Sequence, residues 1–129
     1  MHLATNLRQR LASDESGFTL IELLVVLVII GILLAIAVPS YLGFKDRANN
    51  RAAQSDVREA VPSAEAYYSD NGYYTGLSVA ALKAIDSGLS SAVSVVSGTA
   101  STYCLKGVVS NKTAYFQGPG GTVTSTACT

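Results

Sequence analysis

The chain has 129 residues, of which 49% are hydrophobic and 14% are charged, and its nine basic and nine acidic side chains give a net charge of zero. A neutral chain argues against nucleic acid as an obligatory partner. The length leaves room for one small domain and one membrane span. The single histidine is His2. Because neither an acidic dyad nor a phosphate-binding loop is recognisable, we expect no enzyme, no cofactor and no metal site.

An almost purely apolar stretch begins at Phe18 and continues to Val38, and its only polar side chains are Thr19 and Glu22. A helix needs about 20 apolar residues to cross the hydrocarbon core of a bilayer, so this stretch is long enough. An ionised side chain deep in lipid costs roughly 2.5–3.5 kcal/mol, a penalty that serves no purpose in a plain anchor. Glu22 is therefore predicted to find a partner inside the membrane.

The motif GFTLIE at residues 17–22, which heads this apolar stretch and is followed by Pro39, resembles the class III signal of type IV prepilins and the related pseudopilins. The close resemblance covers residues 16–41, about a fifth of the chain. It implies cleavage between Gly17 and Phe18 by a prepilin peptidase, N-methylation of Phe18, and polymerisation into a thin surface filament. It also implies that the helix between Gly31 and Pro39 loosens when subunits pack. The residues alone fit equally well with Gly31 as an ordinary membrane-helix glycine.

The resemblance implies three parts and an α+β pilin fold. Residues 1–17 are expected to be a leader peptide, and residues 18–44 an apolar transmembrane and filament-core helix. Residues 45–129 are expected to form a globular head that includes an amphipathic second half of the same helix. The Glu22 carboxylate lies one helical turn from Phe18, so a pair with the amine of the same subunit is possible. In the assembled filament it is predicted to pair instead with the charged amine of Phe18 in a neighbouring subunit, which would fix the axial register of otherwise featureless apolar helices.

Two other interpretations of the N-terminus remain open at this stage. In an ordinary secretory signal, Arg8 and Arg10 would form the basic region and residues 35–37 the cleavage site. The apolar region is longer than the usual 7–15 residues, however, and it contains Glu22. The second alternative is a single-span anchor that is never cleaved. The basic residues on both sides of the stretch do not settle its orientation.

The helical pattern continues past the apolar stretch. Apolar side chains recur at spacings of three and four residues and form one stripe, made of Ala53, Val57, Ala60, Val61, Ala64, Tyr67 and Tyr68. The charged residues of this region, Glu65 among them, are expected on the other faces. One helix from about Phe18 to Tyr68 is predicted, with a kink at Pro39. Pro62 makes a straight second half doubtful.

The segment after the helix has turn chemistry at residues 69–72, which read Ser-Asp-Asn-Gly. Four nearby tyrosines are expected to seal the helix against the head with their hydroxyls in water, namely Tyr67, Tyr68, Tyr73 and Tyr74. An aromatic ligand box is the less favoured interpretation. Ser78 is predicted to cap a short helix over residues 79–85, which Gly88 would stop.

The last third of the chain is predicted to form strands. Residues 92–96 are rich in β-branched side chains, and residues 102–109 alternate. Ser110 and Asn111 would turn the chain into a strand over residues 113–117, and a Pro-Gly-Gly turn would lead to residues 122–126. A three- or four-stranded antiparallel sheet that covers the amphipathic half of the helix is the simplest arrangement.

The chain has two cysteines, Cys104 and Cys128. An even count in a chain directed across a membrane favours a disulfide in an oxidising compartment. Two free thiols or half of a metal site are the alternatives, but no further Cys or His is available in this region to complete a zinc shell.

These patterns, together with the resemblance, predict the structural subunit of a type IV pilus. The subunit would be inserted in the cytoplasmic membrane as a single-pass precursor and then assembled outside the cell into a helical homo-oligomer. Its expected partners are the prepilin peptidase, the pilus assembly machinery and the membrane itself. A minor pilin or a pseudopilin of type II secretion or competence DNA uptake is the first alternative. A membrane-anchored binding domain that never polymerises is the second.

Overall fold

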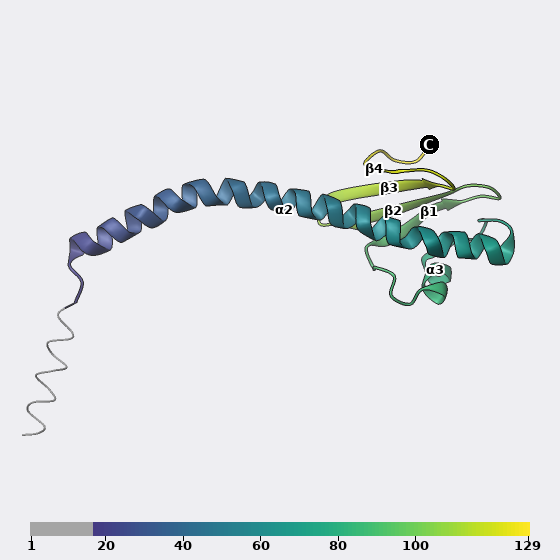
Figure 1. The fold of residues 1–129 in the computed structure, drawn as a ribbon, viewed down its shortest axis with the longest axis horizontal. Helices are drawn as coiled ribbons and strands as arrows, with labels where there is room; N and C mark the ends of the chain where they lie inside the picture. Colours follow the sequence, from purple (N-terminus) through teal and green to yellow (C-terminus); the bar gives the residue numbers. More distant parts are fainter. Residues whose placement is uncertain (1–16) are drawn as a thin grey trace, which may run out of the picture. The chain divides into compact units, whose positions relative to one another are not determined.

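A computed structural model of the chain describes residues 17–129 (Figure 1). It divides into two compact units, one that ends at Tyr41 and one that comprises Leu42–Thr129. The elements, in chain order, are α2 (Leu20–Asn71), α3 (Val79–Ile85), β1 (Val93–Gly98), β2 (Tyr103–Val109), β3 (Lys112–Gly118) and β4 (Val123–Thr124). The predicted α+β fold, a long helix with an apolar first part and a small antiparallel sheet, is confirmed.

Helix α2 contains 52 residues and begins two residues later than predicted. Phe18 was expected inside the helix, but Thr19 precedes the first helical turn and bonds to it, so Phe18 lies outside. The predicted turn at residues 69–72 was also too long, because the helix continues to Asn71. It ends at Gly72, whose φ of +78° suits glycine. The Gly72 N–H donates to the carbonyl of Tyr68 at 2.6 Å.

The helix continues through both of its prolines. Pro62, which made a regular second half doubtful, interrupts nothing. A proline has no N–H to donate to the carbonyl four residues before it, which here belongs to Arg58. Because Pro62 and Arg58 are both exposed, water can bond that carbonyl instead. Near Pro39 the hydroxyl of Ser40 donates to the carbonyl of Ile36 at 3.2 Å.

The second part of α2 packs on the sheet within the unit Leu42–Thr129 (Figure 1). Four small apolar side chains of the predicted stripe are fully buried, namely Ala53, Val57, Ala60 and Ala64. Gly107 in β2 allows a close approach, since a Cβ at this position would lie 2.6 Å from Val57 Cγ2 and 2.8 Å from the carbonyl oxygen of Ala53. The core is completed by the sheet residues Val93, Tyr103, Leu105, Ala114 and Phe116 and by Tyr74, Leu77, Leu82 and Leu89 from the loops and α3.

The sheet is antiparallel with the order β1-β2-β3-β4. The predicted strands are present, with ends shifted by one or two residues, and the fourth shortened to two residues. The β2–β3 turn is made by Ser110 and Asn111 as predicted, since Val109 pairs with Lys112. Ser110 adopts a φ of +56° in this turn. The predicted short helix α3 is present over the expected residues, and Ser78 caps it by accepting from the N–H of Ala81 at 3.2 Å.

The hydroxyl of Tyr74 lies inside the head rather than in water, which corrects the expectation for this tyrosine, and the hydroxyl of Tyr103 binds the same carboxylate. Tyr74 donates to Glu65 Oε2 at 2.9 Å and Tyr103 donates to Glu65 Oε1 at 2.8 Å. Glu65 was placed on a solvated face by its position in the sequence, but it is half-buried. Burial and the negative charge of Glu65 raise the pKa of Tyr74 to about 12 and raise the pKa of Tyr103 further. The phenol–carboxylate contact therefore links the end of α2 to the loop after it and to β2.

The raised pKa values of these tyrosines predict a loss of stability at alkaline pH. An unfolded tyrosine has a pKa near 10, so folding favours the protonated phenol; this contribution is complete below about pH 10 and is lost as the pH rises toward the folded-state values. We expect the free energy of unfolding of the full chain in detergent micelles to fall above about pH 10. Circular dichroism in a denaturant series at several pH values measures this fall.

The Tyr103→Phe variant provides the test. It should be less stable at neutral pH, because one Glu65 oxygen loses its donor, but its stability should fall less steeply with alkaline pH. Tyr73→Phe changes an exposed side chain and is the matched control. An unchanged alkaline slope in Tyr103→Phe would contradict the assignment.

Candidate functional site

The apolar part of α2 is exposed along its whole length. Every described residue from Gly17 to Ala48 is exposed, and even Ile30, the least exposed of the large apolar side chains up to Phe44, has 46% of its surface accessible. Alpha2 is long and apolar enough to cross a membrane. Because such a surface is unfavourable in water, it needs lipid or other apolar helices around it.

Glu22, the only charged side chain among residues 18–44, forms a reciprocal cap at the start of the helix. The Thr19 N–H donates to Glu22 Oε2 at 3.1 Å, and the Glu22 N–H donates to Thr19 Oγ1 at 3.3 Å. This arrangement is a capping box, which satisfies two of the backbone N–H groups that a helix start leaves unpaired. The Thr-x-x-Glu spacing at residues 19–22 is its sequence signature, and sequence reasoning missed it because Glu22 was considered only as a partner for the amine of Phe18.

Apolar side chains surround the Glu22 carboxylate on one side of the helix. Glu22 and its neighbours Phe18, Ile21, Val25 and Val26 line a shallow hollow. A carboxylate accepts up to about four hydrogen bonds at its two oxygens, so the bond from Thr19 to Oε2 leaves capacity for a further donor. The arrangement can hold a cation that approaches from another molecule.

The other residues predicted to act in processing and flexibility occupy the same unit. Gly17 and Phe18 are exposed and precede the helix. Gly31 and Pro39 both lie within α2, and a Cβ added at Gly31 would meet nothing within 4 Å. The predicted leader lies outside the described residues apart from Gly17. The cleavage between Gly17 and Phe18 and the roles of Gly31 and Pro39 stay predictions.

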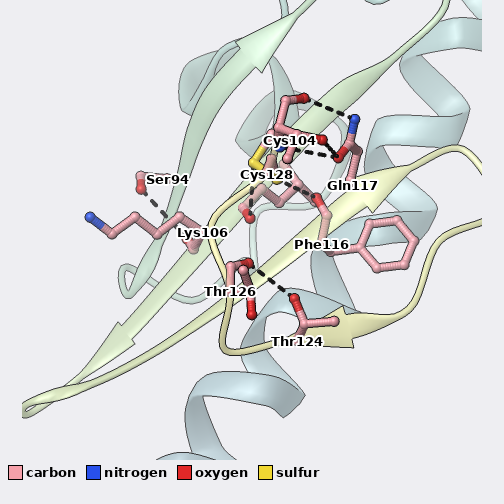
Figure 2. The surroundings of a disulfide bond; sticks show 10 residues. Ser94, Cys104, Lys106, Phe116, Gln117, Thr124, Thr126 and Cys128 are labelled. Atoms are coloured by element: carbon pink, nitrogen blue, oxygen red, sulfur yellow. Dashed lines mark hydrogen bonds between the residues drawn. A yellow bond between two sulfur atoms is a disulfide. The ribbon is translucent and has the colours of Figure 1, made fainter.

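The predicted bond between Cys104 and Cys128 is present, with 6.2 Å between the two Cα atoms (Figure 2). It joins the buried middle of the sheet to the end of the chain. Gln117 holds the same segment, since its amide nitrogen donates to the Thr129 carbonyl at 3.3 Å and its amide oxygen accepts from the Thr129 N–H at 3.4 Å. Among residues 17–129, no three His, Cys, Asp or Glu side chains are grouped to hold a metal ion.

Comparison with known proteins agrees with this architecture. Residues 12–38 match the family model described as the prokaryotic N-terminal methylation motif. Over 108 residues, which are 80% of each chain, the protein is 40% identical to the type IV wide pilus major component PilA4 of Thermus thermophilus. An exposed apolar helix headed by one carboxylate and joined to a small antiparallel sheet defines a pilin-like protein. The chain belongs to the type IV pilin family, a family of structural proteins, and it is not an enzyme.

Shorter similarities connect the chain to secretion proteins. The type II secretion system core protein G of Escherichia coli is 38% identical over 65 residues, and that of Pseudomonas aeruginosa is 42% identical over 61 residues. These matches cover about half of this chain, 50% and 47%, and less than half of each relative, 45% and 43%. The similarity to the pilus component thus extends over more of the chain than the similarity to the secretion proteins.

The disulfide is predicted to contribute a large part of the stability of the head. The two cysteines are 24 residues apart, and closing a loop of this size stabilises by about 3.5 kcal/mol in the chain-entropy model. We expect the double variant Cys104→Ala, Cys128→Ala to unfold at a clearly lower urea concentration than the oxidised protein. Reduction of the native chain should give the same shift, and reduction of the double variant should give none. Equal midpoints for oxidised and reduced protein would show that the bond does not stabilise the head.

Proposed function

We propose that the chain is the structural subunit of a type IV pilus. Residues 18–44 span the cytoplasmic membrane in the precursor, with the leader 1–17 on the inside and the head 45–129 on the outside. A prepilin peptidase cleaves between Gly17 and Phe18, and the mature chain polymerises through α2 into a surface filament. The observation that carries this proposal is the apolar part of α2, which is wholly exposed in the single chain yet includes one carboxylate.

The exposed position of the Gly17–Phe18 bond and the charge that its cleavage creates both support the proposed cleavage. The Gly17–Phe18 bond lies before the first helical turn, where a peptidase can bind the chain in extended form without unwinding a helix. Cleavage converts a neutral peptide nitrogen into the α-amine of Phe18, which is positively charged near neutral pH. N-methylation of this amine keeps the charge. Processing therefore adds a cation at the end of the apolar helix where Glu22 supplies the anion.

An ion pair between subunits explains how processing leads to assembly. Two unit charges about 4 Å apart attract by about 4 kcal/mol at an effective dielectric constant near 20. An unpaired Glu22 in a filament core would lose its hydration, and no attraction to an opposite charge would compensate for that loss. Apolar helices slide past one another easily because their surfaces are nearly uniform, so one fixed pair between Glu22 and the Phe18 amine of a neighbour sets the register.

The capping box is compatible with this role. Thr19 binds Glu22 Oε2, and the carboxylate can accept the neighbour's amine as well. The cap also holds the Glu22 side chain back over its own first turn rather than letting it extend freely. Thr19 thus presents the carboxylate in a defined position, and the entropy lost on pairing is reduced.

Two further residues of α2 are assigned to flexibility in the filament. Pro39 removes the hydrogen bond to the carbonyl of Ala35, and Gly31 has weak helix propensity. The helix between Gly31 and Pro39 is therefore the part of the apolar segment that can loosen at the least cost when subunits pack. The empty space beside Gly31 also permits a neighbouring helix to approach closely.

A pseudopilin or minor pilin is the second candidate, supported by the matches to the core protein G of type II secretion. We favour the pilus subunit because the similarity to the Thermus thermophilus pilus component includes four fifths of both chains. The third candidate, an anchored domain that does not polymerise, would leave Glu22 with its capping role alone.

Three substitutions separate the charge of Glu22 from its capping role. Glu22→Gln keeps a capping-box acceptor but removes the charge. Thr19→Ala removes the side-chain acceptor of the cap but keeps the charge, and Leu23→Ala is the control for an apolar change one residue away. With each variant expressed as the only pilin, we expect Glu22→Gln to give at least about a tenfold loss of filaments, since a pair worth about 1.4 kcal/mol or more is lost per subunit contact.

Thr19→Ala and Leu23→Ala should retain most filaments, measured as pilin recovered by shearing and seen by electron microscopy. All variants should still be inserted in the membrane and cleaved. Normal filaments from Glu22→Gln would show that assembly does not need the charge of Glu22. Loss of filaments in Thr19→Ala alone would show that assembly needs the cap and not the charge.

A further inference from the structure

A polar hollow of about 460 Å³ lies in the unit Leu42–Thr129, where the β2–β3 turn meets the helix. Its lining consists of the ion pair Lys112–Asp46 together with Arg47, Asn50, Asn111, Thr113 and Ser125. The two-residue turn of Ser110 and Asn111 fixes Lys112 at this place, because it joins strands whose register pairs Val109 with Lys112. The family resemblance assigns no role to this hollow.

The lining suits a phosphate group. A guanidinium, an ammonium, side-chain amides and hydroxyls all supply hydrogen-bond donors, and charged donors bind phosphate oxygens strongly. Lys112 Nζ lies 3.8 Å from Asp46 Oδ2, and the Asp46 side chain is 61% exposed. At this distance the two groups form an ion pair without a close hydrogen bond. An exposed ion pair contributes little to the free energy of folding. Lys112 can therefore exchange Asp46 for a better anionic partner.

The charge around the hollow is positive. Its lining holds two basic side chains, Arg47 from α2 and Lys112 from the end of the turn, against the single acid Asp46. Among residues 17–129, Asp46 and Lys112 form the one ion pair. Arg47, the other basic side chain of the lining, is thus available to an external anion.

The position in the sequence identifies the source of the anion. Residues 45–51 directly follow the proposed span 18–44, and seven helical residues rise by about 10 Å. The headgroup region on each side of the hydrocarbon core is about 5–8 Å thick. Residues that directly follow a membrane span lie in or next to the headgroup region, and basic residues next to a membrane are attracted to its anionic lipids.

We propose that this hollow binds the phosphate of an anionic phospholipid on the outer face of the cytoplasmic membrane, with Arg47 and Lys112 as the principal ligands. The bound lipid holds the head at the membrane surface before assembly, and extraction of the subunit into a filament breaks this contact. This inference rests on the membrane-inserted precursor described under the proposed function.

Asp46 provides the decisive test, because it pairs with Lys112 but its negative charge repels a bound anion. If Asp46 and Lys112 formed only a structural ion pair, Asp46→Asn and Lys112→Gln would change the binding of phosphate in the same direction. If it binds phosphate, Asp46→Asn removes a competitor and strengthens binding, whereas Lys112→Gln and Arg47→Gln remove a ligand and weaken it. Lys83→Gln in α3 is a matched change of an exposed lysine elsewhere.

The experiment uses the full chain in micelles of an uncharged detergent. It is titrated with dihexanoyl phosphatidylglycerol, with dihexanoyl phosphatidylcholine and with inorganic phosphate, and binding is followed by the NMR shifts of the Asn111 and Thr113 amides. We expect saturable binding of phosphatidylglycerol that Arg47→Gln and Lys112→Gln each weaken by about tenfold, the effect of one charge-assisted contact. Asp46→Asn should tighten this binding, and Lys83→Gln should leave it unchanged.

Three results would overturn the proposal. Equal affinity for the two lipids would show that the hollow does not select an anionic headgroup. If inorganic phosphate bound as tightly as phosphatidylglycerol, the hollow would be a site for free phosphate. Weaker binding in Asp46→Asn would assign the residues to a structural pair. Because the measurement uses unassembled chains, it succeeds or fails independently of filament formation, so its failure is distinguishable from a failure of the proposed function.

Discussion

The structure depends on one constraint, which is that the first part of α2 is almost purely apolar and, within residues 17–129, wholly exposed. In an ordinary globular protein an apolar helix of this length would be buried by the rest of the fold. Here the buried side chains of α2 are confined to residues 53–64, within the unit Leu42–Thr129. The apolar part must be covered by lipid or by other copies of the chain. In the proposed function, lipid covers it in the membrane-inserted precursor and other copies cover it in the filament.

The head shows how a small domain can be stable on this helix. Small buried side chains on α2 and the absence of a side chain at Gly107 bring helix and sheet backbones together. The disulfide then ties the end of the chain to the middle of the sheet. Because these contacts involve α2 residues well beyond the apolar segment, the head can remain folded while the apolar segment exchanges lipid for neighbouring helices.

Most of the fold could be predicted because its signals are local. The apolar run, the three- and four-residue spacing of the stripe, the Ser78 cap and the β2–β3 turn all depend on residues close together in the sequence. The pairing of Cys104 with Cys128 followed from there being only two cysteines. Pro62, which made a straight second half of the helix doubtful, does not interrupt α2, because an exposed helix face lets water bond the carbonyl that has lost its donor.

What sequence reasoning missed depends on contacts between distant residues. Glu65 looked like a solvated charge, yet Tyr103, 38 residues away, donates to it, and no spacing rule could reveal that contact. The hollow at Lys112 similarly joins the β2–β3 turn to residues near position 46. The Thr19–Glu22 cap is different, since its spacing was visible in the sequence and a search for helix starts would have found it.

The central claim is that the chain is cut at the start of α2 and then covers its apolar surface with other copies. The most direct test is the intact mass and N-terminal sequence of the protein sheared from the cell surface. The account predicts a chain that begins at Phe18, carries one methyl group and sediments as filaments. A chain that begins at Met1 or at Val38, or that is absent from the sheared fraction, would contradict it.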